Sequence, residues 1–535
     1  MKADRRTVLA LCGVAAAGMG AAGAHAFLAE TPPDGVLSGA DFGRGHRLRG
    51  GTFPAPAREE RAGVVIAGGG VAGLAAGWTL ADAGFDDFRL LELEDSVGGN
   101  ARSGRNAVSA FPLGAHYLPV ANREAGALRH MLGRFGMIVG EAEGRPVYDP
   151  LQLCADLQER LFWKGRWQAG LVPRSGLTRH ERDEFARFET EMQGFATLIG
   201  SDGKPGFAIP VAYSSADPAI RALDRWAFSE WLDDRGFTSA PLRAHIRYGT
   251  RDDYGTEPEQ LSAWAGIHYF AGRRGWAAGE TDDNLLTWPE GNARLVRHMA
   301  AAFPNRIASG RLVHRVARDG DGVLVDAFDI ATDETVRFRA DAAILAMPLF
   351  IAARICPEIG DVSACSHAPW VVANVTVERL PEGAGVPVAW DNVSSTSDSL
   401  GYVVATHQSE AITGASVLTW YQPLSRMAPA AGRRLLLERS AEAWKALVRD
   451  DLLAMHPELD GAIRSIDVWR WGHAMIRPTP GYIWGAAQRF ATPPPLYLAH
   501  ADLSGLSIFE EAHFHGTRAA EAAMAQLGHR HEART

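Results

Sequence analysis

The fold predicted for this chain is decided by the stretch Val64-Val65-Ile66-Ala67-Gly68-Gly69-Gly70-Val71-Ala72-Gly73-Leu74-Ala75-Ala76-Gly77. A short apolar run enters a glycine cluster, and a helix-forming run leaves it. Gly68, Gly70 and Gly73 match G-x-G-x-x-G, the spacing that lets a backbone approach a pyrophosphate. Gly68 permits the tight turn, Gly70 keeps side-chain atoms out of the path of the phosphates, and Gly73 allows close packing of helix on strand. The first amides of the helix would face the phosphates, where the helix dipole favours negative charge.

The residues after the glycine cluster complete a nucleotide-binding unit. Residues 72–83 predict a helix that ends at Gly84, and residues 88–92 predict a second strand. Glu92 lies about twenty residues beyond Gly73, the place where dinucleotide-binding folds carry an acid that accepts a hydrogen bond from a ribose hydroxyl. We therefore expect Glu92 at the ribose, and a solvated strand end is the alternative interpretation.

The segment that follows this acid resembles the flavin amine oxidase and phytoene desaturase superfamily. It reads Glu92-Leu93-Glu94-Asp95-Ser96-Val97-Gly98-Gly99-Asn100-Ala101-Arg102-Ser103. The resemblance implies that Gly98 and Gly99 lie against FAD together with a nearby arginine. The family usually has that arginine directly after the glycine pair. Here Asn100 stands at that position, so Arg102 is the candidate for the role.

Other segments spread along the chain resemble the same superfamily. Residues 112–117 resemble the segment near the isoalloxazine ring, and residues 288–296 resemble the return to the flavin domain. Residues 496–502 and 509–520 resemble the closing strand and the helix that points at the flavin, with Asp502 as the acid near the ribityl chain and pyrophosphate. The resemblance also implies that Val313 offers backbone contacts at the adenine end. The predicted cofactor contacts are Gly68, Gly70, Val71, Ala72, Gly73, Glu92, Leu93, Gly98, Gly99, Asn100, Arg102, Gly114, Ala115, His116, Val313, Asp502 and Phe509.

We expect the FAD to be held without a covalent link to cysteine. Members of the family with a cysteinyl flavin carry that cysteine shortly before the closing motif, and no cysteine follows Cys365 here. Attachment through a histidine such as His116 remains open.

The resemblance implies an α/β fold in which a discontinuous Rossmann-type FAD-binding domain is joined to a mixed-sheet, helix-capped α+β substrate domain. The expected FAD-binding domain comprises residues 62–150, 285–350 and 485–530, and the expected substrate domain comprises residues 151–284 and 351–484. Residues 151–283 have a helical pattern, and the period-two alternation of residues 371–377 predicts a strand. Residues 27–61 are expected to form a loosely packed arm.

Composition and charge restrict the partners. The chain of 535 residues is 47% hydrophobic and 22% charged, which is typical of a globular protein. The formal net charge is −9 and no lysine-rich run occurs, so nucleic acid is not an expected partner. The cysteines lack the spacing of a metal site. We expect a small-molecule substrate and an electron acceptor as partners, and leave the oligomeric state open.

The first 26 residues predict an export signal. Arg5 and Arg6 precede an uncharged stretch rich in alanine and glycine, and Ala24-His25-Ala26 offers a cleavage site. The twin-arginine machinery carries proteins that fold before export, which suits a protein that acquires its flavin in the cytoplasm. We therefore expect a periplasmic protein, with a retained N-terminal membrane anchor as the alternative.

His116, Tyr269 and Asn374 are the candidate catalytic residues. His116 could touch the flavin or the substrate, and a packed, hydrogen-bonded histidine is the competing interpretation. Tyr269 belongs to an aromatic run at residues 262–270 that could wall a cavity together with residues 252–255, or could be core. Asn374 falls near the place of a lysine that is thought to assist oxygen in many amine oxidases of the superfamily. An amide carries no positive charge, so a dehydrogenase is favoured over an oxidase.

Three functions are compatible with these motifs. The first is FAD-dependent oxidation of a small amine-like substrate by hydride transfer to flavin N5. The second is FAD-dependent desaturation or isomerisation of an apolar, polyene-like substrate. The third is a non-catalytic exported flavoprotein subunit. The sequence favours them in this order.

Overall fold

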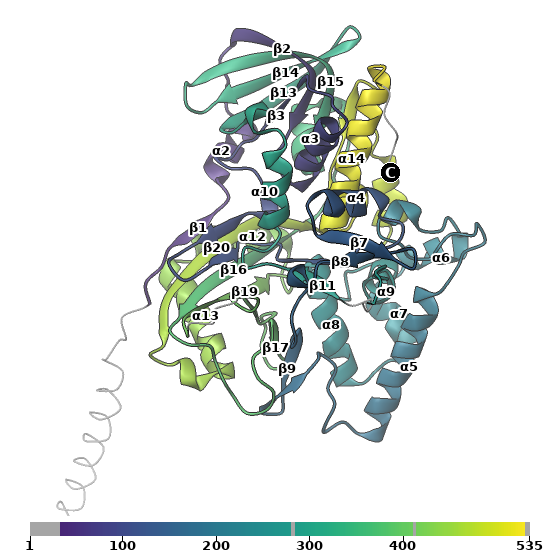
Figure 1. The fold of residues 1–535 in the computed structure, drawn as a ribbon, viewed down its shortest axis with the longest axis vertical. Coiled ribbons are helices and arrows are strands. Elements are labelled where there is room, and N and C mark those ends of the chain that lie inside the picture. The colour runs from purple at the N-terminus through teal and green to yellow at the C-terminus, as the bar shows by residue number, and fades with distance from the viewer. Residues whose placement is uncertain (1–32, 280–283, 410–413, 530–535) are drawn as a thin grey trace, which may run out of the picture.

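The computed structural model describes residues 33–279, 284–409 and 414–529, arranged around two sheets (Figure 1). The predicted export signal lies outside these ranges. The first sheet is at the top of Figure 1 and the second at its lower left, with a group of helices beside the second sheet. The structure shows the predicted fold class, an α/β unit joined to a mixed-sheet unit capped by helices. No described helix has the length and apolar character needed to cross a membrane.

The first sheet is built on the apolar run that precedes the glycine cluster. Its order is β12-β3-β2-β15-β14-β13, and β21 also pairs with β15. The strands are β2 Pro56–Ala67, β3 Phe88–Leu91, β12 Ile307–Ala308, β13 Arg311–Asp319, β14 Gly322–Asp329, β15 Glu334–Leu345 and β21 Leu496–Leu498. The last six residues of β2 are buried, as expected for a parallel strand covered on both faces. The long strand β15 is parallel to β2 along its length and to β21 at its end.

Helices rich in small residues cover this sheet. They are α3 Val71–Asp82, α4 Gly126–Arg134, α10 Ala293–Ala301 and α14 Phe509–Gln526, with α11 Leu349–Ile355 after β15. In Figure 1, α14 runs beside α3. A Cβ atom on Gly516 of α14 would lie 2.1 Å from the carbonyl oxygen of Ala72, so only glycine allows this approach. The closing helix is therefore packed directly on the helix that follows the glycine turn.

The second sheet has eight strands in the order β1-β20-β16-β19-β18-β17-β9-β10. They are β1 Leu37–Gly39, β9 Glu159–Trp163, β10 Arg166–Ala169, β16 His367–Val377, β17 Asp391–Ser394, β18 Tyr402–Val404, β19 Ser416–Pro423 and β20 Ile463–Ile476. The strand predicted at residues 371–377 is confirmed as part of β16. Between β19 and β20 the chain forms two helices, α12 Pro429–Glu438 and α13 Ala441–Met455.

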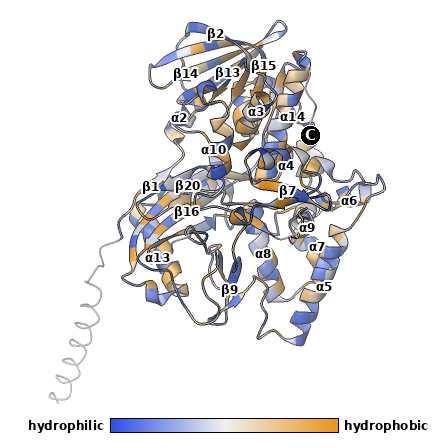
Figure 2. Cartoon of the chain, in the orientation of Figure 1, coloured by the Kyte–Doolittle hydropathy of each residue, from blue (hydrophilic) through white to orange (hydrophobic). Residues whose placement is uncertain are grey.

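Helices cap one end of the second sheet. They are α5 Arg179–Ala196, α6 Pro218–Ala222, α7 Phe228–Asp234, α8 Ala240–Tyr254 and α9 Ala263–Ala271. Figure 2 shows α5 as a largely hydrophilic outer helix, in agreement with its mostly exposed residues. The helical pattern predicted for residues 151–283 is wrong for residues 159–169, because β9 and β10 form an antiparallel hairpin that joins the second sheet.

Three two-stranded sheets lie outside the two large sheets in the described chain. These are β4 Ser103–Arg105 with β5 Ala110–Pro112, β6 Tyr117–Pro119 with β11 Leu285–Thr287, and β7 Ile138–Ala142 with β8 Arg145–Tyr148.

The prediction of a loosely packed arm is wrong for its described part, residues 33–61. Strand β1 pairs in parallel with β20, and residues 56–61 are the first half of β2, paired with β15. Between them lie the short helix α2 Phe42–His46 and a single turn at Arg47–Arg49. The segment thus joins both sheets, which its mixed composition did not indicate.

Candidate functional site

The glycine turn has the geometry that its spacing predicts. Gly68 has a φ of 105°, and a Cβ on it would lie 2.3 Å from the carbonyl oxygen of Ala346. A Cβ on Gly73 would lie 1.9 Å from the carbonyl oxygen of Gly68. At Gly70, in contrast, a Cβ would meet only the Cα of Gly99, at 4.0 Å. The turn is therefore packed on the protein side and open on the side where a phosphate would lie.

Glu92 lies directly after β3 and beside this turn. Its Oε2 accepts a hydrogen bond from the amide of Gly69 at 2.6 Å, and its Oε1 accepts one from the amide of Glu94 at 2.9 Å. Burial raises the pKa of Glu92, while these two hydrogen bonds and Arg102 favour the charged form. The carboxylate is held at the end of the strand, the place predicted for a ribose ligand.

The loop after Glu92 folds back on the turn. The amide of Gly98 donates to the carbonyl oxygen of Gly69 at 2.7 Å, and Gly98 and Gly99 both have positive φ angles. Arg102 lies 3.4 Å from Glu94, and its guanidinium stands over the rings of Trp469 and Trp471. Arg102 therefore contacts both the loop that follows Glu92 and the second sheet.

A cavity begins where this loop ends. Asn100, next to Gly99, lines it together with Gly114, Ala115 and His116 from the segment predicted to lie near the flavin ring. Phe509, the first residue of α14, also lines it. The remaining lining residues are Tyr117, Pro119, Asp252, Asp253, Arg273, Asn292, Trp370, Val372, Tyr421, Trp471, Ala474, Met475, Ser507, Ile508 and Glu510. The cavity thus lies between the end of the loop after Glu92, the capping helices and the second sheet.

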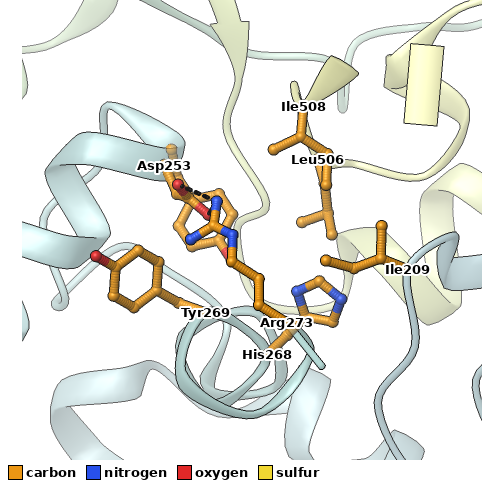
Figure 3. Close-up of a pocket in the computed structure, with 8 residues that line it drawn as sticks. Ile209, Asp253, His268, Tyr269, Arg273, Leu506 and Ile508 are labelled. Carbon is orange, nitrogen blue, oxygen red and sulfur yellow. Dashed lines mark hydrogen bonds and ion pairs between the residues drawn. The ribbon is translucent and has the colours of Figure 1, made fainter. Parts of the chain in front are cut away.

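A narrow crevice continues behind the cavity (Figure 3). The Arg273 guanidinium pairs there with both oxygens of Asp253, at 2.7 and 2.8 Å. Ile209, Leu506 and Ile508 stand across from this pair in Figure 3. Asp253, Arg273 and Ile508 line both spaces, so the ion pair forms the boundary between them.

Carboxylates outnumber cations in the cavity wall. Asp252, Asp253 and Glu510 line it, and within the described ranges Arg273 is the one arginine or lysine among the lining residues. Arg273 is already paired with Asp253. No other described residue donates a hydrogen bond to Asp252 or Glu510. Burial raises the pKa of each of these two carboxyls to about 7, with Asp253 contributing at Asp252.

Aromatic side chains form the opposite wall. His116 stacks on Tyr421 with ring centroids 4.5 Å apart, and its Nδ1 lies 3.2 Å from the carbonyl oxygen of Gly114. Burial lowers the pKa of His116 to about 4, so this ring is neutral at pH 7. Within the described chain, Tyr421 Oη and Trp370 Nε1 are buried without a hydrogen-bond partner.

Asp502, the acid predicted near the ribityl chain and pyrophosphate, is the centre of a buried polar network. It is fully buried; Oδ2 accepts from the amide of Leu349 at 2.9 Å, and Oδ1 lies 3.0 Å from His367 Nε2 and 3.1 Å from His500 Nδ1. Burial alone would raise the pKa of Asp502, but the two histidines outweigh it and hold the pKa well below its ordinary value. This carboxylate joins α11, β16 and the turn after β21, and it is not among the residues that line the cavity.

Tyr269 and Asn374 lie near the cavity but outside its wall. Tyr269 lines the crevice of Figure 3. Asn374 is on the same face of β16 as Trp370 and Val372, which line the cavity. Its Oδ1 accepts from Thr419 Oγ1 at 2.8 Å, and its Nδ2 is buried with no partner among the described residues.

Sequence reasoning missed the roles of Glu510 and Tyr421. Glu510 stands in the closing motif next to Glu511, and a pair of acids at a helix start is ordinary capping chemistry. In the structure Glu511 accepts hydrogen bonds from the amide of Val211 at 2.6 Å and from Ser504 Oγ at 2.5 Å, whereas Glu510 faces the cavity. Asp252 and Asp253 belong to a segment that we expected as a possible cavity wall, and they do line the cavity.

The residues around the turn fit a dinucleotide. The open side of Gly70, the glycine pair with positive φ and the unbonded first amides of α3 form a cradle that an added Cβ would fill. Glu92 would supply the acceptor for a ribose hydroxyl, and the cavity is lined by Asn100, which follows Gly99 of the glycine pair.

Comparison with known proteins agrees with this geometry. The model of the family described as flavin containing amine oxidoreductase matches residues 71–524. A search of the curated protein sequences gives no match.

Solved structures share the fold at low sequence identity. Putrescine oxidase bound to putrescine is 18% identical, with a TM-score of 0.65 over 87% of this chain and 100% of that chain. Cyclohexylamine oxidase from Brevibacterium oxydans IH-35A is 16% identical, with a TM-score of 0.62 over 87% and 99% of the two chains. A fatty acid isomerase from P. acnes is 18% identical, with a TM-score of 0.55 over 87% and 98%.

Gly70→Asp and Glu92→Ala are expected to reduce flavin retention. A carboxylate at position 70 would occupy the open side of the turn and repel the pyrophosphate. Loss of Glu92 removes a charge-assisted hydrogen bond worth roughly 1.5–3 kcal/mol. The measurement is the flavin-to-protein absorbance ratio after purification, with Gly140→Asp at an open position of β7 as the control. Full flavin in both variants would show that the dinucleotide assignment is wrong.

Proposed function

Because this chain belongs to the flavin-containing amine oxidoreductase family, we propose that it is an FAD-dependent enzyme that oxidises a small amine. The family membership supports a flavin oxidoreductase. The amine, the non-covalent binding of FAD and the choice of electron acceptor are inferred from the residues around the cavity.

The observation that carries the amine assignment is the surplus of unpaired acceptors in the cavity. Asp252 and Glu510 accept no hydrogen bond from any other described residue. Asn292 Oδ1, on another lining residue, is buried and has no hydrogen-bond partner among the described residues. Buried acceptors without donors are costly, so such a wall favours a ligand that carries N–H groups and positive charge. An ammonium group meets both requirements.

The aromatic wall suits the same ligand. Trp370, Tyr421 and Trp471 line the cavity, and the faces of such rings attract cations while their edges and faces bury alkyl carbons. His116 is neutral at pH 7 and so adds no competing positive charge. These rings would orient the amine, exclude water and leave its carbon exposed toward Asn100 and Gly114. The flavin, when bound, supplies the hydride acceptor.

The alternative of a polyene desaturase or isomerase is less well supported. An apolar substrate would leave Asp252 and Glu510 without a donor. Two of the similar structures bear names that specify amines, putrescine and cyclohexylamine, and one bears the name of a fatty acid isomerase. Since the fold is shared by all of them, the charges in the cavity are what supports the amine class over the apolar one.

We also propose that the enzyme is a dehydrogenase rather than an oxidase. Asn374 is at the place on β16 predicted for the lysine of many amine oxidases, and it carries no charge to stabilise a developing anion. Its buried, unpartnered Nδ2 can orient a water molecule. A further part of the proposal is that the protein works after twin-arginine export, with an electron acceptor other than oxygen.

Anaerobic mixing with candidate substrates tests the amine assignment. We expect a small amine to bleach the visible flavin spectrum, and a polyene or fatty acid to leave it unchanged. Bleaching by the apolar substrates and by none of the amines would reverse this assignment.

The binding of the amine should depend on pH through the carboxyls of the cavity. Because the pKa of Glu510 and that of Asp252 are raised to about 7, both groups lose their charge as the pH falls below that value. The KM for the amine should therefore rise as the pH falls through this range. Glu510→Gln should raise the KM by about tenfold at pH 8, in line with the loss of one charge-assisted hydrogen bond.

The matched control for Glu510→Gln is Glu442→Gln, an exposed acid in the first turn of α13. The double variant with Asp252→Asn should lose most of the pH dependence of KM. A KM that is independent of pH and equal in all variants would count against an ammonium held by these carboxylates.

The reduced enzyme should react slowly with oxygen. Asn374→Lys should accelerate this reaction by about tenfold or more, because one preorganised donor can stabilise developing negative charge by the corresponding free energy. Stopped-flow reoxidation of wild type, Asn374→Lys and Asn374→Gln measures the effect, and the glutamine variant keeps the amide. Fast reoxidation of the wild type, unchanged by lysine, would contradict both the placement and the dehydrogenase assignment.

A further inference from the structure

The segment Asp41–Phe53 lies outside the region matched by the family model, yet it contacts the residues of the dinucleotide site. It comprises α2 and the turn at Arg47–Arg49. In Figure 1, α2 lies between the two sheets, on the N-terminal side of β2. Asp41 and Arg44, at the start of α2 and within it, contact the loop after β3, which follows Glu92.

Hydrogen bonds lead from this segment to the glycine turn. The amide of Asp41 donates to Glu94 Oε1 at 2.8 Å. Glu94 in turn donates its own amide to Glu92 Oε1 at 2.9 Å, and Glu92 Oε2 accepts from the amide of Gly69 at 2.6 Å. The position of the ribose acid is therefore connected, through one residue, to the N-terminal segment.

Arg44 binds two other residues of the same loop. Its Nη1 donates to the carbonyl oxygen of Leu93 at 3.2 Å and to Asp95 Oδ1 at 2.7 Å. Its Nε lies 3.0 Å from Asp41 Oδ2, so the arginine also fixes the start of α2. One side chain thus bridges the segment and both residues that flank Glu94.

The second half of the segment packs beside Val313, the residue predicted to contact the adenine. Leu48 packs against the apolar cluster that contains Val313. Phe53 stacks on His314 with ring centroids 4.1 Å apart, and the Arg47 guanidinium lies 4.1 Å from the centroid of Phe328. The segment therefore reaches from the ribose loop to the strand predicted to hold the adenine.

The segment also brings positive charge to this region. Burial, followed by Arg433 and His367, lowers the pKa of His473 to about 3. Arg49 and His46 of the segment lie close enough to His473 to add to this effect. His473 precedes Ala474, which lines the cavity and accepts a hydrogen bond from Asn100 Nδ2. Burial lowers the pKa of His46 as well, so the positive charge that the segment brings to this edge is that of Arg49, which favours an anionic ligand.

We propose that residues 41–53 are part of the FAD-binding site, where they hold the loop 92–95 closed over the ADP half of the dinucleotide. Binding of FAD and seating of this segment then stabilise each other, because coupling between two equilibria is reciprocal. The proposal requires the flavin site alone, so an enzyme that fails to oxidise amines would leave it standing.

The first test is the affinity of FAD for apoprotein prepared from the purified full-length chain. Arg44→Ala should weaken FAD binding by about tenfold, measured by quenching of flavin fluorescence. Arg58→Ala is the matched control, since Arg58 forms exposed ion pairs with Glu60 and Glu334 at the start of β2. A dissociation constant for FAD that is equal in Arg44→Ala and wild type would overturn the proposal.

The second test uses wild-type protein and so does not depend on the folding of a variant. Arg44, Arg47 and Arg49 are trypsin sites within the segment, and Lys164, in the exposed turn between β9 and β10, is a reference site far from it in the fold. Adding FAD to apoprotein should slow cleavage in the segment by about tenfold or more while cleavage at Lys164 is unchanged. Mass spectrometry of the fragments separates the sites. No protection, or equal protection at both sites, would show that the segment is not coupled to the cofactor.

Discussion

The structure depends on a set of backbone contacts that only glycine permits at the start of α3. The carbonyl oxygen of Ala346, at the end of β15, lies where a Cβ on Gly68 would be, and the carbonyl oxygen of Gly68 lies where a Cβ on Gly73 would be. On the other side, Gly516 brings α14 against Ala72. Three segments far apart in the sequence are thereby fixed around one helix terminus. The orientation of the phosphate cradle and the position of the first turn of α14 both follow from these contacts.

The first turn of α14 then determines the chemistry of the cavity. Glu511 is held by the amide of Val211 and by Ser504, which leaves the preceding residue, Glu510, to face the open space. With Asp252 it places two carboxyls, which accept no hydrogen bond from another described residue, in a cavity that aromatic rings also line. Burial opposes their charged forms, and their pKa values near 7 are the consequence. Perturbed carboxyls that converge on a cavity are typical of functional sites, and the proposed ammonium ligand would offset the cost of their burial.

The N-terminal segment adds a second constraint on the same site. Residues 37–61 pair with β20 of the second sheet through β1 and with β15 of the first sheet through β2. Between these anchors, Asp41 and Arg44 bind the loop that follows Glu92. The two sheets and the ribose loop are therefore joined by one short stretch of chain. This arrangement explains how residues outside the family's matched region can influence cofactor binding.

The sequence by itself determined the nucleotide-binding unit. The steric demands of Gly68, Gly70 and Gly73 and the position of Glu92 after a buried strand are local properties, so they are visible in a short window. The alternation in residues 371–377 predicted β16 for the same reason. The helical pattern predicted for residues 151–283 did not reveal that residues 159–169 pair as strands in the second sheet, because that pairing depends on residues 391–394, far along the chain.

Only the tertiary structure decided which of the many charged residues form the cavity. Asp252, Tyr421 and Glu510 come from a helix, a strand and the last described helix; the sequence suggests a cavity wall at residues 252–255, but it does not indicate that Tyr421 and Glu510 join this wall. Glu510 and Glu511 are adjacent and chemically alike, and their different roles arise from which one meets the amide of Val211. The sequence likewise predicts a loose arm at residues 41–53, because the order of this segment comes from partners more than 40 residues away, such as Glu94 and Val313. Local patterns report on local sterics, whereas burial and pairing between distant segments arise only when the chain is folded.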